Sequence, residues 1–228
     1  MINPPVSLYN SVNILDTMLA ENIPGGPDNF DAFFEDVLDK FTQVYKREHH
    51  VEFNDEFLFQ VYRYSPPKSD APLEALIGTS FRISSANMIF ATDVMTNSGY
   101  IVPKNRVLGS TDDLTGYSKV ANRITFLQYF DELLYPYYKS KQPGLQRQTL
   151  LDEMSLRSIE DYLRNSDKIY VMHNADDLIL KKGEINFFTD VFGSRAKIYP
   201  YGGHCGNMDY KENVSHMLGL FADAGAEK

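Results

Sequence analysis

The chain has 228 residues, 43% of them hydrophobic, which is enough for one large domain or for a core with an inserted subdomain. Its 22 Lys and Arg residues against 31 Asp and Glu residues give a formal net charge of −9. Phosphate backbones and anionic membranes repel an acidic chain, so we expect no nucleic-acid partner. The single cysteine, Cys205, excludes an intrachain disulfide and zinc sites built on paired cysteines.

The first residues, MINPPVSLYN, lack the basic and apolar regions of a signal peptide. No uncharged apolar run reaches the roughly 18 residues that a membrane-spanning helix needs. The longest candidate, 71–95, contains Glu74, Arg82 and Asp93. As given, the chain is therefore expected to be soluble and cytoplasmic, unless the natural protein begins upstream of Met1 and carries a targeting signal there.

In chain order, Met1–Asn3 resemble the end of a short strand, which the following two prolines terminate because proline cannot donate a ladder hydrogen bond. Residues 7–160 are predicted to be mostly helical. Two apolar stripes at helical spacing are formed by Phe30, Phe33, Phe34, Val37, Leu38, Phe41 and Val44, and by Val120, Ile124, Leu127, Phe130 and Leu134, the second closed by Pro136. Shorter helices are predicted near 7–21, 53–64, 72–96 and 155–165. The 15 Tyr and 15 Phe residues are expected to pack a helical core, but a pocket for an apolar substrate would use the same residues, and composition does not separate the two.

The pattern changes after residue 165. A strand at 168–173, a helix at 181–191, a strand at 196–201 and a helix at 213–221 follow one another. This order favours a parallel sheet. Because two or three strands do not make a stable open sheet alone, we expect further strands to lie upstream of Met1.

The two loops that follow these strands contain the candidate catalytic residues. Asp177 lies in the first loop and His204 in the second, after Gly202 and Gly203. Loops at the carboxyl ends of adjacent parallel strands lie side by side, and one crossover helix fits between the two residues. An Asp held against one ring nitrogen of a His fixes its tautomer and stabilises the imidazolium ion.

The two loops resemble the last two active-site loops of α/β-hydrolases, with Asn174, Asp177, Gly203 and His204 at the matching positions and Asn174 in place of the usual Gly. The opening residues are similar to the strand that follows the nucleophile-bearing helix in that family. The resemblance implies an α/β fold class: the C-terminal part of an α/β-hydrolase parallel sheet with a large, mostly helical lid. Its divisions are a strand at 1–6, a lid at 7–160 and a core at 161–228.

The same resemblance implies an esterase-like or lipase-like serine hydrolase that cleaves ester or other acyl bonds. His204 is then the general base and Asp177 the residue that orients it, with no metal and no organic cofactor. The Gly-x-Ser-x-Gly turn that carries the nucleophile is absent, and we expect it upstream of Met1. The implied partners are a small, apolar acyl substrate and either a second copy or the missing N-terminal segment. Alone, the chain is expected to be inactive.

Two alternatives stay open. The same pair serves acyltransferases with a Cys nucleophile and hydrolases with an Asp nucleophile. A non-catalytic helical interaction module would also use the long amphipathic helices.

Several other residues are expected to be structural or solvated. We expect Asp176 to be a solvated turn residue, His173 a structural residue at a strand end and Cys205 a packing residue. His49 and His50 are expected to be solvated, and His216 to lie on the surface of the last helix.

Overall fold

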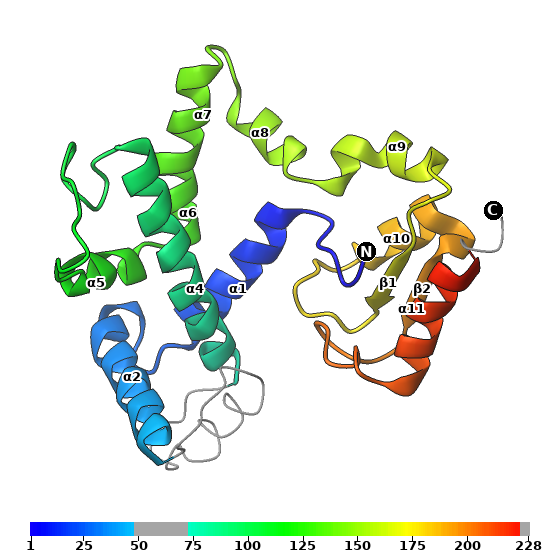
Figure 1. The fold of residues 1–228 in the computed structure, drawn as a ribbon, viewed down its shortest axis with the longest axis horizontal. Coiled ribbons are helices and arrows are strands. Elements are labelled where there is room, and N and C mark those ends of the chain that lie inside the picture. Colours follow the sequence, from blue (N-terminus) through cyan, green and yellow to red (C-terminus); the bar gives the residue numbers. More distant parts are fainter. Residues whose placement is uncertain (48–72, 224–228) are drawn as a thin grey trace. The chain divides into compact units, whose positions relative to one another are not determined.

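The computed structural model describes residues 1–47 and 73–223, which form two compact units (Figure 1). Unit 1 combines Met1–Val12 with Gly144–Lys228, and unit 2 is Asn13–Pro143. The predicted division into a strand at 1–6, a lid at 7–160 and a core at 161–228 depends on the relationship to α/β-hydrolases. It stays a prediction. The predicted helix at 53–64 and the residues His49 and His50 lie outside the described residues.

In unit 1 the elements follow the predicted order of strand, helix, strand and helix. They are α8 (Arg147–Glu153), a 3-10 turn (Leu156–Ile159), α9 (Glu160–Asn165), β1 (Val171–Asn174), α10 (Ile185–Phe192), a 3-10 turn (Gly193–Arg195), β2 (Ala196–Tyr199) and α11 (Lys211–Asp223). In unit 2 they are α1 (Leu8–Asn22, its first residues in unit 1), a 3-10 turn (Pro27–Asn29), α2 (Phe30–Arg47), α4 (Leu73–Thr96), α5 (Thr115–Arg123), α6 (Phe126–Tyr129), a π-helical turn (Phe130–Leu134) and α7 (Tyr135–Lys141).

The predicted α/β fold class, the C-terminal part of an α/β-hydrolase parallel sheet with a helical lid, was wrong. The structure is 62% helix and 6% strand, and within the described residues its sheet has two strands. The physical reason is the pattern of apolar residues. Outside the two short runs that became β1 and β2, these residues recur mainly at helical spacing, so most of the apolar surface is buried by helices.

The small sheet is parallel. β1 pairs with β2 so that Val171 lies opposite Ala196 and Asn174 opposite Tyr199. The first residues of the chain lie beside β1 as well: Ile2 forms an isolated parallel bridge with Met172, and the Asn3 N–H donates to the Met172 carbonyl at 2.9 Å. The start of the chain is thereby fixed next to the end of β1.

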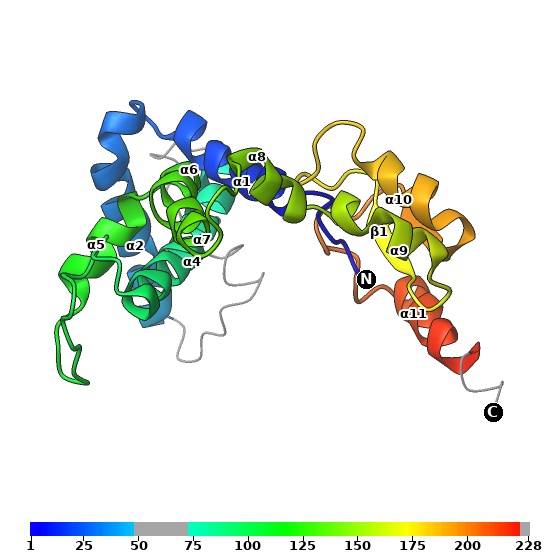
Figure 2. The same cartoon turned by 90° about the horizontal axis from the view of Figure 1, so that it is seen from above.

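The sheet lies between α10 on one face and α11 on the other (Figures 1 and 2). The core on the α10 face consists of Val6, Leu163, Val171, Phe187, Phe188, Val191 and Phe192. Phe188 is fully buried, and its ring stacks on His173 with the ring centroids 4.6 Å apart. Because side chains alternate along a strand, Val171 and His173 face this core, and Met172 and Asn174 face α11.

The helix predicted from the stripe at 120–134 is interrupted in unit 2. Thr125 and Gln128 form a capping box that starts α6, so α5 ends just before it. Pro136 does not close the segment as predicted. α6, the π-helical turn and α7 follow one another without a gap, and Pro136 lies in α7 directly after the π-helical turn.

Unit 2 has its own core, formed by Leu19, Ile23, Phe33, Val37 and Ala75. Inside it, Arg82 of α4 forms a buried ion pair with Asp16 of α1, and its Nε lies 2.8 Å from Oδ1 of Asp16. The two helices approach each other closely at Gly78, where an added Cβ would lie 2.4 Å from the backbone nitrogen of Leu19. None of the helices in 1–47 and 73–223 combines the length and apolarity of a membrane span.

We predict that Gly78→Ala destabilises the protein by about 2 kcal/mol or more, although Ala is normally favoured over Gly in a helix by roughly 1 kcal/mol. The clash is with backbone atoms, which cannot rotate away. Chemical denaturation followed by circular dichroism measures the change. Gly116→Ala in α5 is the matched control, because nothing lies within 4 Å of its added Cβ, and it should cause no loss. Equal stability of the two variants would contradict the close packing of α1 on α4.

Candidate acid–base site

The carboxyl ends of β1 and β2 bring two loops together. The Ala175 N–H donates to the Tyr199 carbonyl at 2.8 Å, so the backbones stay paired as both strands end. The loop after β1 contains Asp176 and Asp177, and the loop after β2 contains His204. Both loops belong to unit 1, as does Asn3 at the start of the chain.

The structure brings Asp177 and His204 into direct contact. Nδ1 of His204 lies 3.0 Å from Oδ2 of Asp177. The Asp177 side chain is completely buried, whereas the His204 side chain is 44% exposed. No described residue forms a hydrogen bond with Nε2 of His204. The imidazole therefore has one nitrogen held by a buried carboxylate and the other available to an incoming group.

Each residue favours the charged form of the other. The hydrogen bond with Asp177 raises the pKa of His204; burial opposes the shift, and the charge of Asp177 adds to it. Burial by itself raises the pKa of Asp177. Its bonds with His204 and the Ile179 N–H, the charge of His204 and the bond from Asn3 outweigh that effect, so its pKa is lowered. The ionised carboxylate accepts, so Nδ1 of His204 carries the proton.

The carboxylate of Asp177 has further donors besides the histidine. Its Oδ1 accepts from the Ile179 N–H at 3.1 Å, and its Oδ2 accepts from the side-chain amide of Asn3 at 3.2 Å. Both oxygens are thus engaged. A buried carboxylate needs such partners, because an unpaired charge away from water is costly.

Gly203, the residue before His204, forms hydrogen bonds through both its N–H and its carbonyl. The Gly203 N–H donates to Oδ1 of Asp176 at 2.8 Å, and the Gly202 N–H donates to Oδ2 of Asp176 at 3.2 Å. The Gly203 carbonyl accepts from the side-chain amides of Asn174 at 2.8 Å and of Asn3 at 3.1 Å. Asp176 is exposed as predicted. Its carboxylate also accepts both hydrogen bonds from the histidine loop, a role that the sequence did not indicate.

Hydrogen bonds between two asparagines hold the same loop at Asn207, after His204. Asn174 and Asn207 are both buried and exchange amide hydrogen bonds of 3.0 and 2.8 Å. Gly202 passes so close to them that an added Cβ would lie 2.4 Å from the Asn207 side chain, and its φ of +146° also disfavours other residues. Asn174, which departs from the resembled pattern, therefore has a structural role of its own.

The other residues that the sequence singled out do not form hydrogen bonds with Asp177 or His204 side chains in the described residues. His173 is completely buried: its Nδ1 accepts from the Asn174 N–H at 2.9 Å, and its Nε2 donates to the Pro4 carbonyl at 3.1 Å. Its Nδ1 lies 3.8 Å from Oδ2 of Asp177, beyond hydrogen-bond distance. Burial, together with the charge of Asp177, raises the pKa of the Cys205 thiol, which makes it a poor nucleophile. His216 lies in α11 and is partly exposed.

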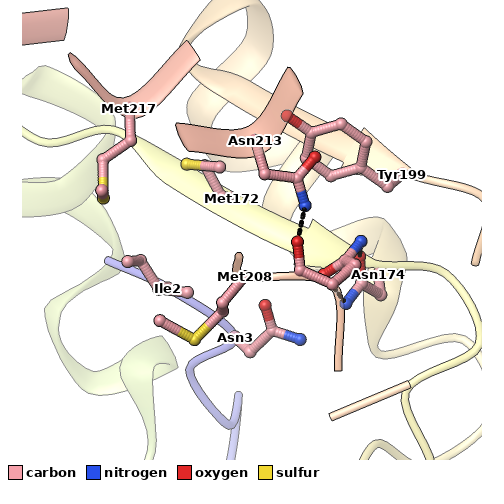
Figure 3. A pocket seen from close by; sticks show the side chains of 9 residues that line it. Ile2, Asn3, Met172, Asn174, Tyr199, Met208, Asn213 and Met217 are labelled. Carbon is pink, nitrogen blue, oxygen red and sulfur yellow. Dashed lines mark hydrogen bonds between the residues drawn. The ribbon is translucent and has the colours of Figure 1, made fainter. Parts of the chain in front are cut away.

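A small cavity lies on the α11 side of the sheet (Figure 3). Its volume is about 20 Å³, and Asn3, Asn174, Tyr199 and Asn213 are among the residues that line it. The Tyr199 hydroxyl is buried and has no hydrogen-bond partner among the described residues. One water molecule fills such a space, whereas a substrate pocket is typically about 300 Å³ or larger. This cavity therefore belongs to the packing behind the pair and is not a substrate site.

The sequence analysis did not predict that the side-chain amides of Asn3 and Asn174 hold the loops around the pair. One signal for them exists: Asn3 and Asn174 end strand-like runs of mostly apolar residues, MIN and KIYVMHN, and asparagine is disfavoured in strands. An Asn at such a position indicates that its side chain bonds to a neighbouring loop. Which loop it bonds to depends on the pairing of the chain start with β1, a contact between residues far apart in sequence.

Comparisons with known proteins find no match for this chain, whether among family models, curated proteins or solved structures. Across the described part of the chain, no three or more His, Cys, Asp or Glu side chains are grouped to bind a metal ion.

We predict that the pKa of His204 lies above its ordinary value near 6.5 and falls in Asp177→Asn, because an amide lacks the negative charge that favours the imidazolium ion. Titration of the imidazole nitrogens by NMR measures both values. His216 provides the internal control, because its titration should be the same in both proteins. A His204 titration unchanged by Asp177→Asn would show that the pair does not form in solution.

The pair also makes the stability of the fold depend on pH. The raised pKa of His204 contributes stability that is full below its ordinary value and is lost as the pH rises through the raised value. The lowered pKa of Asp177 contributes stability that is full above its ordinary value near 3.8 and is lost as the pH falls through the lowered value. Both contributions are therefore complete between about pH 4 and pH 6.5.

We accordingly expect the unfolding free energy lost in His204→Ala to be greatest near pH 5 and to shrink toward pH 9. The loss should not exceed about 1 kcal/mol, because the half-exposed imidazole is screened by solvent. Denaturant titrations at pH 5, 7 and 9 measure it, with His216→Ala as the control. A loss that grows with pH would contradict the assigned charges.

Proposed function

We propose that Asp177 and His204 are the acid and the base of a hydrolytic site for ester or other acyl bonds, with the nucleophile supplied by polypeptide outside this chain. The observation that carries the proposal is the 3.0 Å contact between Nδ1 of His204 and Oδ2 of a completely buried Asp177. It leaves Nε2, the nitrogen that moves the proton in such sites, free of bonds from the described residues.

The chemistry follows from this division of roles. Nε2 of His204 accepts the proton of an attacking hydroxyl group, and the carboxylate of Asp177 stabilises the imidazolium ion that forms. The same nitrogen then donates the proton to the departing alkoxide or amine. The raised pKa of His204 favours the protonated intermediate state of this cycle.

The resemblance of the two loops to those of α/β-hydrolases supports a serine as the nucleophile and an ester or other acyl bond as the bond that is cleaved. The 228 residues contain no Gly-x-Ser-x-Gly turn, and the Cys205 thiol, whose pKa is raised, is poorly suited to replace the serine. A partner polypeptide is therefore part of the proposal. It would bring the serine and the oxyanion-binding N–H groups.

We predict that the pure chain does not turn over a chromogenic acyl ester, and that turnover appears when it is produced together with the polypeptide encoded directly upstream. His204→Ala or Asp177→Asn should then reduce the rate by on the order of 10⁴-fold, because the members of such a triad act as a unit. A fluorophosphonate probe should label a serine of the added polypeptide.

His216→Ala is the matched control for this assay and should leave the rate unchanged, since this residue of α11 lies outside the pair. Turnover by the pure chain that survives His204→Ala would contradict the proposal. So would the absence of turnover and of serine labelling with the upstream polypeptide present.

A further inference from the structure

We infer that Asn3 is a positioning residue for the Asp177–His204 pair, because one side-chain amide holds the acid and the loop of the base at the same time. Its Nδ2 donates to Oδ2 of Asp177 at 3.2 Å and to the Gly203 carbonyl at 3.1 Å. The inference rests on the proposed function, since positioning has a catalytic consequence only if the pair moves a proton.

The NH₂ group of asparagine is suited to this position because it has two hydrogens and can serve two acceptors at once. The acceptors here come from different loops, so the amide sets the distance between them. Oδ2 of Asp177 is also the oxygen that His204 contacts at 3.0 Å. Asn3 and His204 thus share one oxygen, and the amide fixes the direction from which the histidine meets it.

The backbone of Asn3 is also suited to the task. Its φ is +42°, in the left-handed region that asparagine tolerates better than most residues with a Cβ. The residue is 5% exposed, and its N–H is anchored to the Met172 carbonyl of β1 at 2.9 Å. The amide is therefore presented from a fixed backbone and not from a free chain end.

The Gly203 carbonyl also has a second donor besides Asn3. The fold of the histidine loop therefore does not depend on Asn3, and the effect of Asn3 on the pair can be measured separately. Asn174 also donates to the Gly203 carbonyl, at 2.8 Å, and Asp176 holds the Gly203 N–H at 2.8 Å. Loss of the Asn3 amide should therefore leave the histidine loop in place. Its one effect at the pair should be that Oδ2 of Asp177 loses the hydrogen bond from Asn3. The charged or titratable groups around the Asp177 carboxylate are His204, His173, the Cys205 thiol and, in the same loop, Asp176.

The test is an NMR titration of Asn3→Gly, which removes the amide and tolerates the left-handed backbone. We expect the pKa of Asp177 to rise, because its charged form loses a hydrogen bond, and the Nδ1 proton of His204 to exchange faster with water. Asn10→Ala is the matched control. It removes an amide that donates to Oε1 of Glu184 at 2.8 Å in the same unit, and it should leave both readouts unchanged.

Asn3→Asp gives the same test with the side-chain size kept, should Asn3→Gly unfold unit 1. A second carboxylate beside Asp177 should raise the pKa of Asp177 further than the glycine does. An Asp177 titration and a Nδ1 exchange rate that are unchanged in a folded Asn3 variant would overturn the inference.

Activity separates this inference from the proposed function. With the upstream polypeptide present, Asn3→Gly should lower kcat roughly 10-fold with little change in KM, because the amide touches the acid and the loop of the base and not the substrate. A shifted Asp177 titration in a protein without any hydrolytic activity would support the positioning role and overturn the proposed function alone. A normal titration together with full activity would overturn the positioning role alone.

Discussion

The carboxylate of Asp177 is a negative charge buried away from solvent, and it needs hydrogen-bond donors there. The surrounding loops are arranged so that they provide these donors. A buried ion is tolerated only when donors replace the water it has lost. Three segments provide them: the start of the chain through Asn3, the acid loop itself through the Ile179 N–H, and the histidine loop through His204. Through these hydrogen bonds, Asp177 links segments that lie far apart in the sequence.

The parallel pairing of β1 and β2 makes this arrangement possible. Both strands end at the same edge, and the bridge between Ile2 and Met172 places Asn3 at that edge too. α10 packs its phenylalanines on one face of the strands, which keeps them in register. The sheet is small, and its contribution is to align three chain segments so that their polar ends converge.

Local patterns were sufficient to predict most helices, both strands and the contact between Asp177 and His204. Apolar spacing determines helices locally, and the loop contact follows from the order strand, helix, strand. The predicted α/β class failed because an α/β sheet of that family needs several strands, and in the described residues the sheet has two. The break at Thr125 was missed because a capping box outweighed an unbroken apolar stripe.

The reciprocal amides and the two glycines of the histidine loop have a consequence for tracing the ancestry of this protein. Gly202 cannot take a side chain beside Asn207, and Asn174, Asp176 and Asp177 each have a distinct set of acceptors or donors. Together they define a sparse signature: an Asn-x-Asp-Asp segment at the end of one strand and a Gly-Gly-His-x-x-Asn segment after the next. Contacts within unit 1 constrain the residue types at these positions, whereas an exposed helix position has no such constraint. Genomes can be searched with this signature for polypeptides that share the site although the rest of their sequence has diverged.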